Sequence, residues 1–297
     1  MSDHAPAAWR SLLYVPANRS RFVEGATRRG ADAVILDLED SVPQEQKAAA
    51  RAGLPAAIET VACGRGDVLV RVNRNWADLV PDLAATVHPD VTAINLPKVD
   101  DPAVVRVVSE MLDELEARRG LAPGQVRIFA RIETARGVRR IDDILHASER
   151  VVATAIGTGD LAIESRLDPG GDAIRQAFVE VTLAARAAGV RPLGLPGLIV
   201  DFANIDAFRR TAEDARGLGS RGAPCIHPSQ VPVLNDVFGL QPAEVEAARE
   251  VVAAFEEAAA DGRGSLVHRG TFIDVANYQQ ARRLLEESRR QQDGESA

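Results

Sequence analysis

The chain has 297 residues, of which 46% are hydrophobic and 4% aromatic, and its formal net charge at neutral pH is −8. This length suits one large domain or two small ones, and the negative charge disfavours a nucleic-acid partner, because phosphate binding needs a basic surface. Cys63 and Cys225 form no metal-ligand spacing and no disulfide framework, so a reducing cytoplasm is the expected location. No membrane segment is expected, because no apolar run approaches the roughly 18 to 20 residues of a span, and the N-terminus lacks the form of a signal peptide.

Short runs rich in β-branched residues alternate with stretches of helical periodicity along most of the chain. The predicted strands are residues 11–16, 33–40, 68–73, 92–98, 126–133, 151–160, 191–197 and 223–228. The predicted helices are residues 19–29, 44–62, 77–87, 102–119, 137–147, 173–188, 205–216 and 229–237. Such alternation is typical of parallel strands joined by crossover helices. Eight units in about 240 residues predict an α/β fold of the (β/α)8 TIM-barrel type, and an open doubly wound sheet is the alternative.

A helical extension follows the barrel, which we assign to residues 9–240, and the extension itself covers residues 241–290. Its first part, residues 242–262, has the apolar spacing of an amphipathic helix. A short strand or hairpin is expected over residues 265–274, followed by a last helix. The final stretch, residues 291–297, is expected to be disordered.

Residues of special chemistry or geometry gather where the predicted strands end. They are Pro16, Arg19, Asp37, Glu39, Asp40, Arg71, Asn73, Lys98, Arg131, Glu133, Asp160, Pro196 and His227. In a barrel of this type the strand ends form the face that carries the active site. Any one of the carboxylates taken alone is better explained as a helix cap or an ion-pair partner. Because so many acids and bases converge on one mouth, the set predicts an active site built by several strands together.

Glu133 and Asp160 are the candidate metal ligands. Strand alternation places Glu133 on the same side of its strand as Arg131, and both face the mouth if the apolar residues between them pack against helices. Gly157 and Gly159 allow a tight turn just before Asp160. Two carboxylates on neighbouring strands, with space for water and substrate oxygens, suit magnesium. The alternative is a salt-bridged rim that holds no metal.

Arg71 ends the third predicted strand and is the candidate group for an anionic substrate, because arginine holds a carboxylate through two parallel hydrogen bonds. It is also a natural ion-pair partner for Asp37 or Glu39, and the two interpretations are compatible. His227 is either a general base or a side chain that orients the mouth. The chain contains neither a complete dinucleotide fingerprint nor a phosphate-binding P-loop, so no nicotinamide cofactor is expected.

Seven motifs occur in a fixed order: RSLLYVPANRSRF, GADAVILDLEDSVPQEQKAAAR, LVRVN, RIETARGV, GTGDLA, LAARAAGV and CIHPSQV. In this order they resemble the citrate lyase beta-subunit-like family of the 2-keto-hydroxy-acid aldolase superfamily, which includes malyl-CoA and citramalyl-CoA lyases. The resemblance extends over residues 9–285, nearly the whole chain. It implies a (β/α)8 barrel that depends on Mg2+.

The resemblance also implies roles for single residues. Glu133 of RIET and Asp160 of GTGDLA correspond to the metal ligands, and Arg71 of VRVN to a catalytic and substrate-binding arginine. Asp274 of the C-terminal extension corresponds to a catalytic acid that enters the active site of a neighbouring subunit in a homotrimer or hexamer. The chain departs from the family at several rim positions, such as Ala223 where lysine is usual, and these departures leave the carrier of the acyl group open.

We therefore expect a magnesium-dependent lyase that cleaves or forms a 3-hydroxyacyl-CoA thioester, such as malyl-CoA or citramalyl-CoA, giving a 2-keto acid and acetyl-CoA. The alternatives are a citrate lyase beta subunit acting on a citryl thioester of an acyl carrier protein, a free 2-keto-hydroxy-acid aldolase, and a non-catalytic subunit. The residues expected to contact substrate are Arg71, Glu133, Asn73 and Arg19. The residues expected to orient Arg71 and metal-bound water are Asp37, Glu39 and Asp40.

Overall fold

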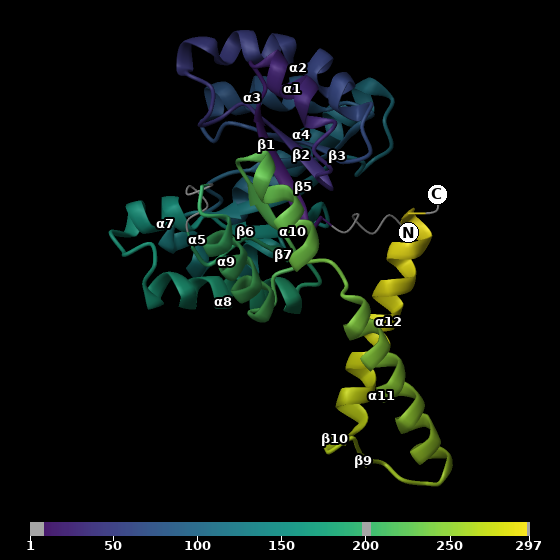
Figure 1. Cartoon of the computed structure of the whole chain (residues 1–297). Helices are drawn as coiled ribbons and strands as arrows, with labels where there is room; N and C mark the ends of the chain where they lie inside the picture. Colours follow the sequence, from purple (N-terminus) through teal and green to yellow (C-terminus); the bar gives the residue numbers. More distant parts are fainter. Residues whose placement is uncertain (1–8, 198–202, 296–297) are drawn as a thin grey trace. The chain divides into compact units, whose positions relative to one another are not determined.

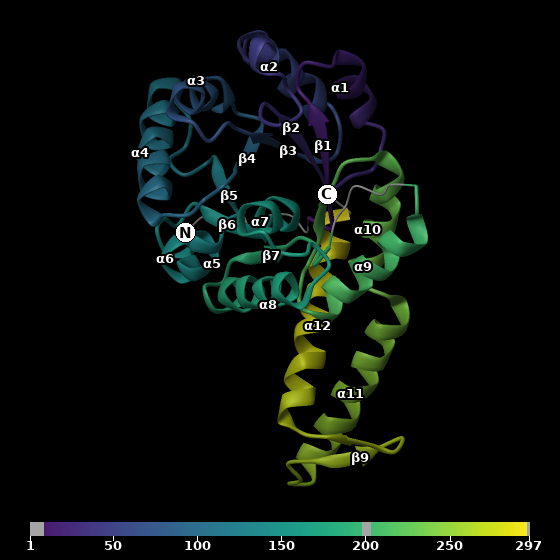
Figure 2. The same ribbon diagram turned by 90° about the vertical axis from the view of Figure 1, so that its left-hand side faces the viewer.

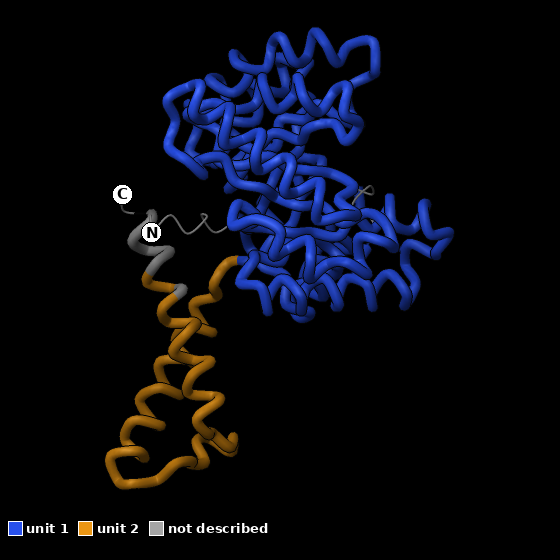
Figure 3. The backbone as a smooth tube through the Cα atoms, turned by 180° about the vertical axis from the view of Figure 1, so that it is seen from behind, with its two compact units in different colours: residues 1–238 blue, residues 239–297 orange. Residues whose placement is uncertain are grey.

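The structure is a computed structural model of the chain and describes residues 9–197 and 203–295. The chain divides into two compact units between Phe238 and Gly239 (Figure 3), two residues before the boundary expected from the sequence. No helix in these described ranges is both long and apolar enough to cross a membrane.

The first unit is built around eight parallel strands (Figure 1). They are β1 (Ser11–Pro16), β2 (Ala33–Asp37), β3 (Asp67–Arg71), β4 (Val91–Leu96), β5 (Arg127–Ile132), β6 (Val151–Ile156), β7 (Arg191–Leu193) and β8 (Ala223–Cys225). They pair in the order β7-β6-β5-β4-β3-β2-β1-β8. Two backbone hydrogen bonds bridge the remaining gap, from Arg221 N to Pro192 O at 2.9 Å and from Gly194 N to Gly222 O at 2.8 Å. The predicted barrel is therefore confirmed, in a nearly closed form.

Helices surround these strands (Figure 2). They are α1 (Ser20–Ala26), η1 (Gln44–Gln46), α2 (Lys47–Ala62), α3 (Trp76–Thr86), α4 (Pro102–Arg119), α5 (Ala135–Arg139), α6 (Ile141–Leu145), α7 (Thr158–Ser165), α8 (Asp172–Ala187), α9 (Ile205–Gly217), η2 (Pro228–Gln230) and α10 (Val231–Val237). The single helix predicted over residues 137–147 is wrong, because the chain breaks at Arg140 into two short helices. Helix α7 was not predicted, and it begins immediately after β6.

The predicted strands extend too far at the mouth, and the end of β2 shows why. The carboxylate of Asp37 accepts the backbone N–H groups of Glu39 at 2.9 Å and Ser41 at 3.1 Å. An Asp side chain that bonds the backbone ahead of it in this way turns the chain out of a strand. Glu39 and Asp40 therefore lie in a loop above β2, although the prediction continued the strand through residue 40.

The interior of the barrel is packed with apolar side chains. They are Trp9, Leu12, Ala33, Ile35, Leu69, Ala93, Phe129, Ala153, Ala155 and Leu193. Fully buried Trp9 also donates Nε1 to Asp67 Oδ2 at 2.6 Å. A larger apolar cluster between strands and helices contains Ile128, Ala130 and Ile132 of β5. The two faces of β5 are therefore as predicted, with Phe129, Arg131 and Glu133 on the side of the barrel axis.

The second unit consists of two helices joined by a hairpin. They are α11 (Pro242–Ala260), β9 (Leu266–His268), β10 (Thr271–Ile273) and α12 (Val275–Glu295). The rings of Phe255 and Tyr278 stack with their centroids 4.7 Å apart, and Tyr278 Oη donates to Glu256 Oε1 at 3.1 Å. Helix α12 continues to Glu295, so the expected disorder of the tail is wrong for residues 291–295.

Candidate active site

Arg71, the last residue of β3, is held by carboxylates that follow from β2. Its Nε and Nη2 donate to Asp37 Oδ1 and Oδ2, both at 2.7 Å. Its Nη1 donates to Asp40 Oδ2 at 2.9 Å and lies 2.9 Å from Glu39 Oε2. The parallel register of β2 and β3 sets Asp37 directly opposite Arg71, so the sheet itself creates this pair. The ion pairs expected from the sequence are present, and the role of Arg71 toward substrate stays a prediction.

Asp37 and Glu39 lie two residues apart but differ in acidity. Burial acts to raise the pKa of Asp37, but the hydrogen bonds and charge of Arg71 outweigh it and hold that pKa below its usual range. Burial raises the pKa of Glu39 to about 7, against the charge of Arg71 and with the help of Asp40. Glu39 Oε2 is buried and accepts no hydrogen bond from the described residues, so its loss of hydration is only partly compensated.

Lys98, which follows β4, connects Glu39 with Glu133. Its Nζ donates to Glu39 Oε1 at 2.9 Å, and its backbone N–H donates to Glu133 Oε2 at 3.0 Å. The other oxygen of Glu133, Oε1, accepts a hydrogen bond from Arg131 Nε at 2.7 Å. Each carboxylate oxygen therefore has one N–H donor. These donors fix the plane of the Glu133 carboxylate and leave further lone pairs for a cation.

Asp160 lies in the first turn of α7, close to Glu133. Burial and the negative charge of Glu133 raise the pKa of Asp160. Its carboxylate makes no hydrogen bond or ion pair with any residue that the structure describes. Gly157 leaves room for this arrangement, because a Cβ there would lie 2.5 Å from Glu133 Cγ and 2.8 Å from Arg131 Nη2. The two predicted metal ligands therefore lie together, with glycine required beside them.

Tyr14 of β1 and Asn95 of β4 belong to the same network, and the sequence analysis missed both. Tyr14 Oη accepts hydrogen bonds from Arg131 Nη1 at 2.7 Å and Asn95 Nδ2 at 2.9 Å. The guanidinium carbon of Arg71 lies 4.7 Å from the centroid of the Tyr14 ring, in the geometry of a cation–π contact. One aromatic side chain therefore positions two arginines. The available signal was strand alternation, which places Tyr14 with Leu12 on the interior face of β1.

A cavity of about 350 Å³ opens beside this network. It is lined by Glu39, Asp40, Val42, Lys47, Asn73, Arg74, Asn75 and Lys98. Asn73 Nδ2 donates to Leu38 O at 2.9 Å and to Asp82 Oδ2 at 2.7 Å. These bonds occupy both hydrogens of the Asn73 amide. If Asn73 contacts substrate as predicted, it must do so through Oδ1, as a hydrogen-bond acceptor.

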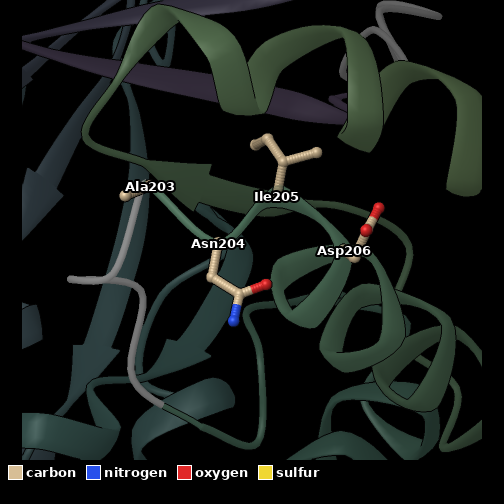
Figure 4. A pocket seen from close by; sticks show the side chains of 4 residues that line it. All are labelled: Ala203, Asn204, Ile205 and Asp206. Atoms are coloured by element: carbon tan, nitrogen blue, oxygen red, sulfur yellow. The ribbon is translucent and has the colours of Figure 1, made fainter.

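A second cavity, of about 440 Å³, lies where the chain enters α9. It is lined by Ala203, Asn204, Ile205 and Asp206 (Figure 4). Asn204 Oδ1 accepts the backbone N–H of Ala207 at 3.1 Å and so caps the helix. None of the predicted site residues lines this cavity, so the cavity beside Glu39 is the better candidate for binding substrate.

The charges and donor atoms of the mouth fit a divalent cation. The carboxylates are Asp37, Glu39, Asp40, Glu133 and Asp160, and the cations among them are Arg71, Lys98 and Arg131. At the edge of the mouth the ammonium of Lys47 donates to backbone oxygens, and Arg74 Nη2 lies 3.6 Å from Asp100 Oδ1. Within the described ranges, no three His, Cys, Asp or Glu side chains cluster in a way that could hold a metal. Mg2+ suits such a site, because one or two carboxylates and several waters commonly complete its shell.

Two further predicted residues of the first unit, His227 and Arg19, lie in the segments that follow β8 and β1. His227 Nδ1 accepts the backbone N–H of Ser229 at 3.2 Å and caps η2, which supports its interpretation as an orienting group. Arg19 is exposed at the start of α1. Asp274 belongs to the second unit, where its Oδ1 accepts two backbone N–H groups at 2.9 and 3.1 Å and caps α12. The role expected for Asp274 in a neighbouring chain stays a prediction.

Comparison with known proteins decides the family. Residues 10–228 match the model of the family described as HpcH/HpaI aldolase/citrate lyase. The chain belongs to this family. The resemblance stated from the motifs is therefore confirmed, and so is the expected class of enzyme, because the members are aldolases and lyases.

Individual relatives agree with this assignment. The chain is 36% identical over 287 residues to a Cereibacter sphaeroides protein named (3S)-malyl-CoA thioesterase, covering 95% of each chain. It is 31% identical over 302 residues to the L-malyl-CoA/beta-methylmalyl-CoA lyase of the same species, covering 94% of each. The crystal structure of CitE from Mycobacterium tuberculosis, in complex with magnesium, acetoacetate and coenzyme A, has a TM-score of 0.75 at 29% identity and covers 94% of this chain and 98% of that one.

Proposed function

We propose that this protein is a magnesium-dependent lyase acting on a 3-hydroxyacyl-CoA thioester such as malyl-CoA or citramalyl-CoA. The reaction breaks the bond between the hydroxyl-bearing carbon and the carbon next to the thioester. The hydroxyl proton leaves to solvent as that carbon becomes the carbonyl of a 2-keto acid, and the released enolate takes up a proton on carbon to give acetyl-CoA. The observation that carries the proposal is that Glu133, held by Arg131, lies close to Asp160, whose carboxylate has no hydrogen-bond or ion-pair partner among the described residues. It is supported by the relative named as a malyl-CoA lyase and by magnesium and coenzyme A in the CitE crystal.

Glu133 and Asp160 are the residues that would hold Mg2+, which when bound supplies a Lewis acid for the hydroxyl and carboxylate oxygens of the substrate. Arg131 and the backbone of Lys98 keep the Glu133 carboxylate in one orientation. Because these donors are in place before substrate arrives, no reorganisation is needed when charge develops in the reaction.

Arg71 stabilises the negative charge that moves onto the thioester oxygen as the carbon–carbon bond breaks. A preorganised donor of this kind is commonly worth roughly 3 to 4 kcal/mol. Asp37 binds Nε and one hydrogen of Nη2, and Nη1 faces Asp40 and Glu39, so the second hydrogen of Nη2 is the one left to meet the substrate oxygen. In this position the carboxylates of Glu39 and Asp40 orient the Nη1 group of Arg71 and the water around it.

Asp274 of a neighbouring copy is the proposed acid that protonates the carbon of the acetyl enolate after cleavage, and it removes the same proton in the condensing direction. This role requires a homotrimer or hexamer, in which one chain completes the site of another. Arg19 and Asn73 are the proposed further contacts with the acyl-CoA, Asn73 through its Oδ1 in the cavity beside Glu39.

Hydrolysis of the thioester is the second candidate function. It is favoured by one observation, the 36% identity to a protein named (3S)-malyl-CoA thioesterase over 95% of both chains. A citryl thioester carried by an acyl carrier protein is a further candidate substrate, because a citrate lyase beta subunit is also among the relatives, at 29% identity. The protein atoms that bind Mg2+ would be the same in each case. Hydrolysis would break the carbon–sulfur bond, whereas cleavage of a citryl thioester would break the same kind of carbon–carbon bond as in malyl-CoA.

The test is to incubate the protein and Mg2+ with malyl-, citramalyl- and citryl-CoA and to identify both products by mass spectrometry. A 2-keto acid with acetyl-CoA supports the lyase, whereas a hydroxy acid with free coenzyme A identifies a thioesterase. Turnover that needs the acyl carrier protein as thioester carrier favours the citrate lyase role. Equal turnover with and without a metal chelator overturns the magnesium-dependent proposal.

A further inference from the structure

Lys98 has a backbone conformation that its place in the chain does not explain. Its φ is +51°, and the described residues contain two other non-glycine positions with positive φ, Arg166 and Arg269. Arg166 caps the C-terminus of α7, and Arg269 lies in the two-residue turn between β9 and β10, where left-handed residues are ordinary. Lys98 lies between β4 and α4, outside any such cap or hairpin. A strained position of this kind persists only where the surroundings hold it, often at a functional site.

The contacts of Lys98 show what the left-handed backbone achieves. Its N–H is directed at Glu133 Oε2, at 3.0 Å, and its carbonyl oxygen accepts a hydrogen bond from Arg74 Nε at 3.3 Å. Its ammonium donates to Glu39 Oε1 at 2.9 Å and lies 3.9 Å from Asp40 Oδ1. One residue therefore connects loops that follow β2 and β3 with the carboxylate that follows β5. These bonds offset the strain and fix the direction of the N–H.

Among the described residues, two groups direct the carboxylate of Glu133. Arg131 Nε binds Oε1 and the Lys98 N–H binds Oε2, while Gly157 leaves space along the side chain without directing it. If the Lys98 peptide rotated to an ordinary negative φ, Oε2 would lose its donor and the carboxylate would be free to turn about Oε1. The orientation of Glu133 thus depends on a backbone angle at a residue of a different strand.

We infer that Lys98 is a positioning residue for the metal site: its left-handed backbone, rather than its ammonium group, sets Glu133 in the orientation that binds Mg2+. This inference rests on the proposed function, because it assumes that Glu133 is a metal ligand. Groups that orient a ligand commonly change metal affinity by about 10- to 100-fold when they are lost.

Two substitutions separate the backbone from the ammonium group. Lys98→Gly removes the ammonium but adopts positive φ freely, so its Mg2+ affinity should equal that of the parent protein. Lys98→Val removes the ammonium and strongly disfavours positive φ, so its Mg2+ affinity should fall by about 10- to 100-fold. Lys98→Ala, which has no ammonium bond to offset the strain, should lie between them. Mg2+ binding is measured by calorimetry without substrate, and folding by circular dichroism and thermal melting.

Arg166→Val and Arg166→Gly form the matched control, because they make the same two changes at another left-handed position, the end of α7, which has no bond to Glu133. Both should bind Mg2+ like the parent. If Lys98→Val fails to fold, a weaker affinity for Lys98→Ala than for Lys98→Gly carries the same conclusion. Equal affinity in all Lys98 variants, or an equal loss in Gly and Val, overturns the inference while the proposed function stands. Absence of Mg2+ binding by the parent overturns both.

Discussion

On the side of the mouth that follows β2 and β3, buried acid and base satisfy each other. Asp37 and Arg71 share two hydrogen bonds of 2.7 Å, and the pKa of Asp37 is held low although burial acts to raise it. On the side that follows β5 and β6, Glu133 has its own donors but Asp160 has no partner among the described residues, and its pKa is raised. The carboxylate of Asp37 on the β2–β3 side is paired with Arg71, whereas the β5–β6 side has carboxylate oxygens that remain available to bind a cation. Two regions built from the same residue types are therefore suited to different work, holding an arginine and binding a cation.

The largest effect is expected from neutralising the side that has spare oxygens. Glu133→Gln or Asp160→Asn should lower magnesium-dependent turnover by roughly 100- to 1,000-fold, the loss typical of a preorganised electrostatic group, and should abolish Mg2+ binding while the fold is kept. Glu164→Gln, an exposed change on the same helix as Asp160, is the control and should leave both unchanged. Full turnover in either test variant would remove the distinction between the two sides.

Breaking the pair of Asp37 and Arg71, on the β2–β3 side, should mainly lower the free energy of unfolding. Asp37→Asn leaves the guanidinium of Arg71 buried without its charged partner, and the loss of one member of a buried pair commonly costs about 3 to 5 kcal/mol of unfolding free energy. We expect the low end, because Asp40 and Glu39 remain within 2.9 Å of Arg71. Urea denaturation measures the change. Glu114→Gln, which breaks the exposed pair with Arg118, should have no measurable effect, and equal losses in both variants would contradict the comparison.

Crowding the Mg2+ side tests its geometry without changing its charge. Gly157→Ala places a methyl group 2.5 Å from Glu133 Cγ, so Glu133 must move and Mg2+ affinity should fall by about tenfold. Gly25→Ala in α1, where an added Cβ meets no atom within 4 Å, is the matched control. Calorimetric Mg2+ titration compares them. An unchanged affinity in Gly157→Ala would show that the position of Glu133 is less restricted than its contacts indicate.

The smallest expected effect is a pH dependence of the unfolding free energy, and it arises from Glu39, which lies between the two sides. The pKa of Glu39 is about 7 in the folded protein and 4.5 ordinarily, so folding takes up a proton between these values. Its contribution to stability is complete below pH 4.5 and is lost as the pH rises through about 7. Glu39→Gln should remove this loss. Urea denaturation with Mg2+ chelated, at several pH values in this range, should therefore show a steeper decline for the parent, and parallel curves would contradict the assignment.

Much of the barrel could be predicted, because eight repeats of a short β-branched run and a helical stretch allow few other architectures. The inward face of Glu133, which follows β5, was also predictable, since alternation fixes it once Phe129 is placed inside. Helix α7 was missed because it begins within GTGD, where two glycines favour a loop interpretation. The end of β2 was misplaced because the turn depends on hydrogen bonds of the Asp37 side chain.

The network itself could not be predicted from residue types. Lys98 directly follows a proline in the sequence. Its hydrogen bond to Glu133 depends on its φ angle, which cannot be read from the sequence. Tyr14 looks like an ordinary aromatic of a buried strand, and its importance comes from the two arginines that converge on it from β3 and β5. Such relations arise only when strands distant in sequence become neighbours, so they follow from the fold and not from any one motif.

The packed interior of the barrel has a consequence for the order of events. Trp9, Phe129 and their neighbours pack along the axis, and these described side chains block the path from the mouth toward the opposite end. Whatever arrives beside Glu133 must depart through the entrance by which it came. For the proposed lyase reaction, a keto acid held near the strands beneath a bulkier coenzyme thioester would then leave after it.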